Sequence, residues 1–372
     1  MTRFDGKRKI MNSPQLVFAE NSPYGTVEAI IEQDDHVAFF YLRALNNESF
    51  GMKSCWVRNL VDAPEELDRA RLSAGNPPVL PARFCRSASA QSRLQEKTLR
   101  VVWFEEGDGA ALLEDDETIA IIPAWSGVEG FEGYSKECVG QSPFGWEMPG
   151  TDNLENRIKL ADQFWKSWQT EKSPWDEYEP RLLESMEKRW GPVQKYFSID
   201  GGEWPPRTLA QFAKDQKTIL VSVGTSICPQ PRVEMAFDIP GAFRRFELAA
   251  CFEESESPER VDAFARYMSS QVALPWQKQT FFAHGHSVSC RQFLDDDSYP
   301  DFSSIFLVEQ GQLPEECQVR LPEVFGDPVN LLWTVPVFEH ERKQVQESNN
   351  LALLDSVIRE KGIPLIHRRA SL

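Results

Sequence analysis

Short apolar runs separated by polar turns dominate the first half of the chain. Gly25–Glu32 and Val37–Arg43 are two such runs, and the polar segment Gln33–His36 joins them, which predicts a β-hairpin. Further short strands are predicted at Ser54–Leu60, Leu99–Phe104 and Thr118–Ile122. Pro64–Leu72 fits a short helix. Because Glu105–Glu117 holds seven acidic residues and two glycines, it is predicted to be a solvated loop.

Helical spacing appears after a stretch rich in Gly, Pro and aromatic residues at Gly127–Gly150. An apolar stripe repeats every three or four residues from Leu154 to Trp168, and Asp152 precedes it as a plausible N-cap. A second helix is predicted at about Asp176–Trp190, where Gly191 follows. The change in pattern predicts two domains, a β-rich one at 1–148 and a second at 149–372.

The remaining sequence alternates strands and helices without an internal repeat. A helix is predicted to begin at Pro258 with Ser257 before it, and another to run from about Asn350 to Lys361. Strands are predicted at Thr218–Thr225, Phe243–Phe252, Thr280–Phe282, Ser304–Glu309 and Val329–Phe338. These strands are too short and too irregularly ordered for a doubly wound sheet, so the predicted class is α+β with mixed sheets and packed helices.

Charge narrows the classes of partner. The 372 residues include 57 acidic and 40 basic side chains, which gives a net charge of −17. Such a surface repels phosphate backbones and anionic lipid, so we expect no nucleic-acid partner and no membrane partner. The apolar runs are far shorter than the ~20 residues that a bilayer requires. No apolar stretch of signal-peptide length follows the basic segment Met1–Asn12, which predicts a cytoplasmic protein.

Motifs for small-molecule chemistry are missing. The sequence has no GxGxxG after a strand, no GxxxxGK[ST] and no GxSxG, so no cofactor is predicted. Gly224-Thr225-Ser226 follows a predicted strand but lacks the second glycine of a nucleophile turn. The acidic run Asp295–Asp297 lacks the calcium-loop pattern and is predicted to be a solvated turn. Seven widely spaced cysteines without CxxC predict buried thiols rather than a disulfide framework or a structural zinc site.

The best metal candidate is His284-Gly285-His286, with Cys290 four residues later. If this segment is a strand, both imidazoles project from one face and can reach the same ion. The alternative is a pair of hydrogen-bonded structural histidines, and we expect no metal. A metal-assisted hydrolase that uses His284, His286 and Glu341 is therefore the runner-up to a non-enzymatic protein.

Three charged residues, Arg244, Arg245 and Glu247, interrupt the apolar strand at Phe243–Phe252, and the two arginines must point to opposite faces. Arg245 and Glu247 share a face at i, i+2, and a buried Arg needs a carboxylate partner. One interpretation is a structural Arg245–Glu247 pair, and the other is a polar wall that holds a ligand peptide. Arg245→Ala separates the two interpretations. Loss of a structural pair lowers the melting temperature, whereas loss of a binding wall weakens partner capture without unfolding the chain. Glu339 and Glu341 also share a face if the strand Val329–Phe338 continues through them.

The order of motifs in the second half resembles the Suppressor of fused family, over about residues 180–365. The family's "FGLS"-like strand end, "FEL" strand and "LARY" helix correspond to Val223–Ser226, Phe246–Leu248 and Phe264–Tyr267. A glycine turn at Gly285 and an apolar strand into Glu341 follow in the same order. In the animal family member this module comes first, whereas here a different β-rich domain precedes it, and the histidine turn departs from the animal pattern. The Hedgehog-pathway partner of the animal protein is therefore not carried over.

The compact chain looks like the bacterial branch, whose members are proposed to be immunity proteins against polymorphic toxins. The resemblance thus implies a non-enzymatic, two-domain binding protein that sequesters or neutralises a protein partner, by strand addition or in a groove. A basic toxin fits the acidic surface, and a regulatory adaptor of an endogenous signalling or transcription protein is the alternative. The expected partner-binding residues are Arg245, Glu247, His286 and Glu341. The sequence sets no oligomeric state.

Overall fold

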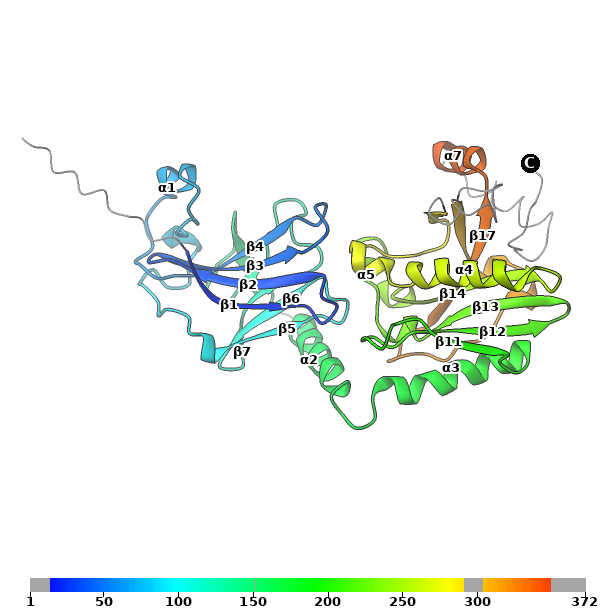
Figure 1. The fold of residues 1–372 in the computed structure, drawn as a ribbon. Coiled ribbons are helices and arrows are strands. Elements are labelled where there is room, and N and C mark those ends of the chain that lie inside the picture. The colour runs from blue at the N-terminus through cyan, green and yellow to red at the C-terminus, as the bar shows by residue number, and fades with distance from the viewer. Residues whose placement is uncertain (1–13, 151, 291–303, 349–372) are drawn as a thin grey trace, which may run out of the picture. The chain divides into compact units, whose positions relative to one another are not determined.

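The computed structural model describes residues 14–150, 152–290 and 304–348. Contacts divide the chain into two compact units, Met1–Gln163 and Phe164–Leu372, called units 1 and 2 below. The division falls inside helix α2 (Asp152–Ser167), and the boundary predicted at 148/149 stays a prediction. The combination of a β-rich unit 1 with sheet and helices in unit 2 confirms the α+β class (Figure 1).

Unit 1 contains two sheets. The first is an antiparallel meander of β1 (Gln15–Asn21), β2 (Val27–Gln33), β3 (Val37–Ala44) and β4 (Met52–Asn59), in that order. It includes the predicted hairpin, as β2 and β3. The second has the order β5–β6–β7–β8–β10–β9. Its strands are β5 (Leu99–Trp103), β6 (Ala110–Glu114), β7 (Glu117–Ile122), β8 (Tyr134–Ser135), β9 (Gln141–Ser142) and β10 (Gly145–Glu147).

Two helices belong to this part of the chain. α1 (Arg69–Ser73) occupies part of the segment predicted to be helical. α2 packs on the second sheet, where its Ile158 and Ala161 join a buried cluster with Phe104 and Ile121. Another cluster surrounds Trp56 of β4. The sheets therefore bury separate apolar faces against their neighbours.

The prediction of a solvated loop at Glu105–Glu117 was wrong. Ala110–Glu114 forms β6, which pairs with β5 and β7 on its two sides. Glu106 is buried, and its carboxylate pairs with Arg157 of α2 at 3.3 Å. The many acidic residues concealed the short apolar core of the segment, Ala110–Leu113.

Unit 2 is built on one seven-stranded sheet with the order β11–β12–β13–β14–β17–β16–β15. Neighbouring strands are antiparallel except β14 and β17, which are parallel. The strands are β11 (Lys195–Ser198), β12 (Thr208–Lys214), β13 (Lys217–Val223), β14 (Arg245–Glu253), β15 (Ser287–Ser289), β16 (Ser304–Glu309) and β17 (Val329–Val337).

Helices cover both faces of this sheet (Figure 1). α3 (Pro174–Trp190) starts with a capping box at Ser173 and places Leu182, Met186 and Trp190 in an extensive buried cluster. α4 (Pro258–Gln271), capped by Ser257, lies on the other face, where Phe264 packs against Phe252 of β14 at 5.5 Å. α5 (Leu274–Lys278) and α7 (Glu339–Ser348) follow.

The second half differs from the predicted elements after α5. Thr280–Phe282 is not a strand but an irregular segment after α5, so that prediction was wrong. The helix predicted at Asn350–Lys361 and the acidic turn at Asp295–Asp297 lie outside the described residues.

Candidate functional site

Two buried charged residues begin the central strand β14. Arg245 and Glu247 each have 0% exposure, and they alternate with Phe246 as the period of a strand requires. Ala249 and Cys251 continue the same face and belong to the cluster that includes α3. The two charges therefore lie on the α3 face of the sheet, at one end of its central strand.

Glu247 holds the turn that follows β13. Its Oε1 accepts hydrogen bonds from Gly224 N at 3.0 Å and from Ser226 N and Oγ at 3.0 and 2.6 Å. Its Oε2 accepts one from Ser222 Oγ at 2.5 Å. Burial raises the pKa of Glu247, and these donors oppose that rise because they favour the carboxylate. The two carboxylate oxygens of Glu247 thus hold the backbone of Gly224–Ile227 in place. Gly224 has a φ of 96°, a left-handed conformation that glycine adopts without strain.

Arg245 ties this turn to a second loop. Its Nη1 donates to the carbonyl oxygens of Ser226 and Ile227 at 3.0 and 2.7 Å, and its Nε donates to Asp327 Oδ2 at 2.9 Å. The guanidinium also lies 5.3 Å from the centre of the Phe325 ring. The sequence suggested Glu247 as the carboxylate partner, whereas the structure gives Arg245 the more distant Asp327 and uses Glu247 for the serines.

The loops held in this way form what we call the loop platform, residues 224–244 and 324–328. Asp327 also contacts Arg244 at 3.6 Å, and Asn330 Nδ2 donates to the carbonyl of Ala242 at 2.8 Å, so the two segments are joined. Three large apolar side chains of the platform are exposed: Met235 at 38%, Ile239 at 71% and Phe325 at 41%. The platform thus combines exposed apolar side chains with a buried polar support.

His284 and His286 lie in a turn rather than on a strand, so the expected strand geometry was wrong. Gly285 between them has a φ of 85°, which breaks the alternation that would have aligned the two rings. The backbone N–H of Glu309 donates to His284 Nδ1 at 3.3 Å, and His286 Nδ1 lies 3.1 Å from the carbonyl oxygen of Phe281. Among the described residues, no group of three or more His, Cys, Asp or Glu side chains is placed to hold a metal ion.

His286 belongs to an aromatic row that leads to the loop platform. Its ring lies 5.1 Å from that of Phe281, which packs edge-on against Phe237, and Phe237 stacks on Phe243 at 4.0 Å. Gln230 adds two hydrogen bonds with the backbone of Phe282, at 2.9 and 2.8 Å. The histidine turn therefore packs beside the platform.

We expect acid to destabilise the protein partly through His286. Burial lowers the pKa of His286 below 6.5, so the unfolded chain binds this proton first as the pH falls through that value. The free energy of unfolding should decrease between neutral pH and about pH 5. His286→Gln should reduce this decrease, which denaturant titrations at a series of pH values measure. The exposed His340→Gln is the control, and equal slopes for wild type and His286→Gln would contradict the expectation.

Glu341 lies away from the other predicted residues. The strand ends at Val337 and helix α7 begins at Glu339, so the expected strand continuation was wrong. Glu341 is 2% exposed, and its carboxylate accepts the backbone N–H of Phe338 at 2.9 Å, which caps the first turn of α7. Arg245 pairs with Val329 at the start of β17, whereas Glu341 follows the end of this nine-residue strand. The structure brings Arg245 and Glu247 together on one face of β14. The histidine turn follows Phe282, which packs on Phe246 of the opposite face, and Glu341 lies apart from both.

Comparison with known proteins supports the resemblance in the second half. Residues 202–369 match the family model described as Suppressor of fused protein (SUFU). Unit 2 carries a Suppressor of fused-like domain. The match confirms the resemblance predicted at about 180–365, and the family is a non-enzymatic binding family. The Suppressor of fused-like domain is thus a protein-binding module by family.

No curated protein matches the chain. Among solved structures, the chain is similar to one described as "the Sufu-Fu complex crystal structure", with 12% identity and a TM-score of 0.37. That alignment covers 52% of this chain and 91% of the other.

The structure shows how two motifs of the Suppressor of fused-like domain meet. Val223–Ser226 and Phe246–Leu248 are far apart in sequence, yet Glu247 accepts hydrogen bonds from Gly224 and Ser226 of the first motif. Sequence reasoning weighed Ser226 only as a nucleophile and missed Asp327. The available signal for Asp327 was its place in the turn Gly326-Asp327-Pro328 just before β17.

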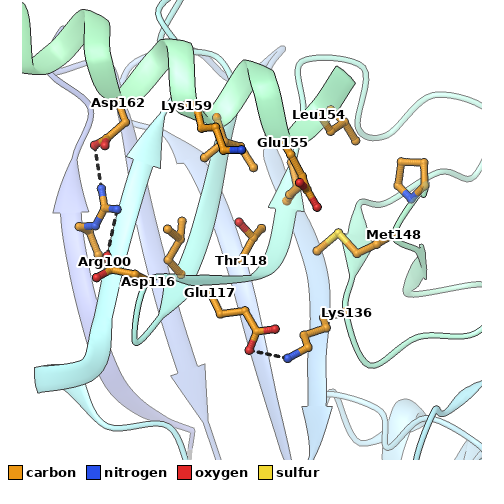
Figure 2. Close-up of a pocket in the computed structure, with 14 residues that line it drawn as sticks. Arg100, Asp116, Glu117, Thr118, Lys136, Met148, Leu154, Glu155, Lys159 and Asp162 are labelled. Carbon is orange, nitrogen blue, oxygen red and sulfur yellow. Dashed lines mark hydrogen bonds and ion pairs between the residues drawn. The ribbon is translucent and has the colours of Figure 1, made fainter. Parts of the chain in front are cut away.

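A separate cavity of about 480 Å³ lies in unit 1, between α2 and strands β6 and β7 (Figure 2). Its apolar lining includes Leu113, Ile121, Met148, Leu154 and Ile158. Charged residues surround it, and Figure 2 shows Arg100 pairing with both Asp116 and Asp162, and Lys136 with Glu117. Arg100 joins β5 to α2 through Asp162, and the other two pairs link residues at or beside strand ends. No predicted site residue lines this cavity.

No helix in the described ranges is both long and apolar enough to cross a bilayer.

Proposed function

We propose that this chain is a non-enzymatic protein that binds and sequesters a protein partner through its Suppressor of fused-like domain. The match of residues 202–369 to a protein-binding family carries the proposal. The loop platform supports it, because it presents the exposed apolar side chains of Met235, Ile239 and Phe325, and such side chains are typical of binding surfaces.

Arg245 and Glu247 act in this proposal as positioning residues. With 0% exposure neither side chain reaches a partner, but each fixes backbone that carries the platform. His286 contributes through its packing on the aromatic row. Glu341, at the other end of β17, keeps its part in capping α7. The contact residues are instead Ile239, Met235 and Phe325.

The partner class that best fits is a basic protein toxin, which this chain would neutralise. The net charge of −17 speeds encounter with a positively charged protein and disfavours acidic competitors. Such attraction is screened over ~8 Å at physiological ionic strength, so capture should weaken as salt rises. A regulatory adaptor that holds a signalling or transcription protein needs no such dependence.

The test is capture of partners from native lysate by the tagged chain, at low and at moderate salt, identified by mass spectrometry. We expect one basic protein that is released by salt and inhibits growth when it is expressed alone. An enriched signalling or transcription protein would instead indicate the adaptor. If nothing is retained above the tag alone, the binding proposal fails.

Ile239→Asp is expected to weaken capture by the loop platform at least about ten-fold, because it places a charge in the apolar contact. The matched control is Leu16→Asp, which changes a side chain of similar size and 62% exposure in unit 1. Titration of the captured protein against both variants measures the difference. Since Ile239 is 71% exposed, both variants should retain the wild-type free energy of unfolding. If Ile239→Asp and Leu16→Asp bind the captured protein equally well, the contact surface lies outside the loop platform.

A further inference from the structure

Two cysteines of unit 1 face each other across a short antiparallel bridge. Cys85 and Cys138 are directly opposed residues of this bridge. The backbone N–H of Arg86 donates to the carbonyl of Glu137 at 2.8 Å, and that of Val139 donates to the carbonyl of Phe84 at 2.9 Å. These flanking hydrogen bonds make the cysteines a non-hydrogen-bonded pair, the arrangement in which opposed Cα atoms lie closest, at ~4.5 Å.

That spacing suits a disulfide. Disulfides join residues whose Cα atoms are ~4.4–6.8 Å apart and whose side chains leave the same face. Both side chains belong to the cluster around Trp56, which confirms that they share a face. All seven cysteines are reduced in this structure. The backbone is therefore already placed for a bond that has not formed.

The two thiols differ in access. Cys138 is fully buried, and its Sγ donates to the carbonyl of Gly145 at 3.0 Å. Cys85 is half-buried, with its Sγ 3.4 Å from the carbonyl oxygens of Leu80 and Pro81. A small oxidant therefore reaches Cys85 first, which makes Cys138 the resolving thiol.

We propose that Cys85 and Cys138 are a site of reversible disulfide formation driven by a low-molecular-weight disulfide such as oxidised glutathione. The Cys85 thiolate attacks one sulfur of the oxidant, which releases one glutathione thiol and leaves a mixed disulfide on Cys85. The Cys138 thiolate then attacks Sγ of Cys85, forms the Cys85–Cys138 bond and releases the second glutathione thiol. Two protein thiols lose their hydrogens, and one glutathione disulfide becomes two thiols.

Oxidation is expected to be slow at neutral pH. Burial, with the neighbouring Cys138, raises the pKa of Cys85 to about 11, so few molecules carry the reactive thiolate. Burial likewise raises the pKa of Cys138. The carboxylate of Glu137 raises the pKa of Cys85 further, and the carboxylate of Glu147 raises that of Cys138. Oxidation should accordingly speed up at mildly alkaline pH.

Cys55 is a third thiol near this pair and the competing partner. It is buried in β4, and its Sγ lies 3.4 Å from the carbonyl oxygen of Tyr134. Cys55 pairs with Phe40 of β3 in the sheet, whereas the bridge sets Cys85 opposite Cys138. The register therefore favours Cys85 over Cys55 as the partner of Cys138.

The experiment treats the reduced full chain with oxidised glutathione at mildly alkaline pH, followed by alkylation, digestion and mass spectrometry. We expect a product lighter by two hydrogens, with Cys85 linked to Cys138, that returns to the starting mass with dithiothreitol. Because the bond closes a loop of roughly fifty residues, the melting temperature of unit 1 should rise by about 5–10 °C.

Controls separate this pair from other thiols. Cys55→Ser should form the same linked product, whereas Cys85→Ser and Cys138→Ser should not. A link from Cys55 to Cys138, links between molecules, or seven thiols that still alkylate after denaturation would each overturn the proposal. The mapping on the wild-type chain decides the matter even if a serine variant fails to fold.

Discussion

Arg245→Ala should lower the free energy of unfolding of unit 2 by about 3–5 kcal/mol. The substitution leaves the carboxylate of Asp327 without its closest cation and the carbonyls of Ser226 and Ile227 without their donor. It also removes the group beneath Phe325. Urea titration followed by circular dichroism measures the loss.

Arg244→Ala is the matched control for this prediction. Arg244 contacts the same carboxylate of Asp327, but at 3.6 Å and with 23% of its side chain exposed. Its removal should cost less than about 1 kcal/mol, as is usual for exposed ion pairs. Similar losses for the two arginines would show that burial does not decide the effect. Loss of partner capture by Arg245→Ala without any loss of stability would restore the interpretation of a ligand-holding wall.

Glu247→Ala should destabilise the domain by a similar amount, about 3–5 kcal/mol. Four buried donors from Ser222, Gly224 and Ser226 lose their acceptor, and no water is expected to replace it at 0% exposure. Glu253→Ala, at the exposed end of the same strand, is the control and should stay within about 0.5 kcal/mol of wild type.

The two buried charges should not act independently. Arg245 donates to the carbonyl oxygen of Ser226, and Glu247 accepts from the amide N–H and the hydroxyl of the same serine. The double variant should therefore lose less than the sum of the single losses, since residues in one network are coupled by ~0.5–3 kcal/mol. Strict additivity would mean that the turn at Ser226 is held by other contacts.

Much of the fold could be predicted because strands and helices carry local patterns. The predicted runs at Ser304–Glu309 and Val329–Phe338 correspond to β16 and β17, and Ser257-Pro258 marks the start of α4. Short strands such as β8, β9 and β15 were missed, since two or three residues show no periodicity. The acidic segment that contains β6 shows the opposite error, in which composition outweighed a short apolar core.

The candidate site was predictable only where geometry is local. Alternation along one strand correctly placed Arg245 and Glu247 on one face. The partners of these residues could not be predicted, because Asp327 lies 82 residues from Arg245 and reaches it only through the pairing of β14 with β17. The strand geometry expected for His284 and His286 was wrong for a local reason, the positive φ of Gly285, and that expected for Glu341 was wrong because a helix begins where the strand was extended.

The parallel pairing of β14 with β17 also sets the order in which the parts of the domain can be completed. On a ribosome, Arg245 emerges well before Asp327 and before the strand that completes the centre of the sheet. Until that later strand is made, the Arg245 side chain stays in water, and residues 224–244 lack the contacts with Asp327 and Asn330 that join them to the second segment. The loop platform can therefore take the form described above only after residues 324–328 and β17 have been synthesised.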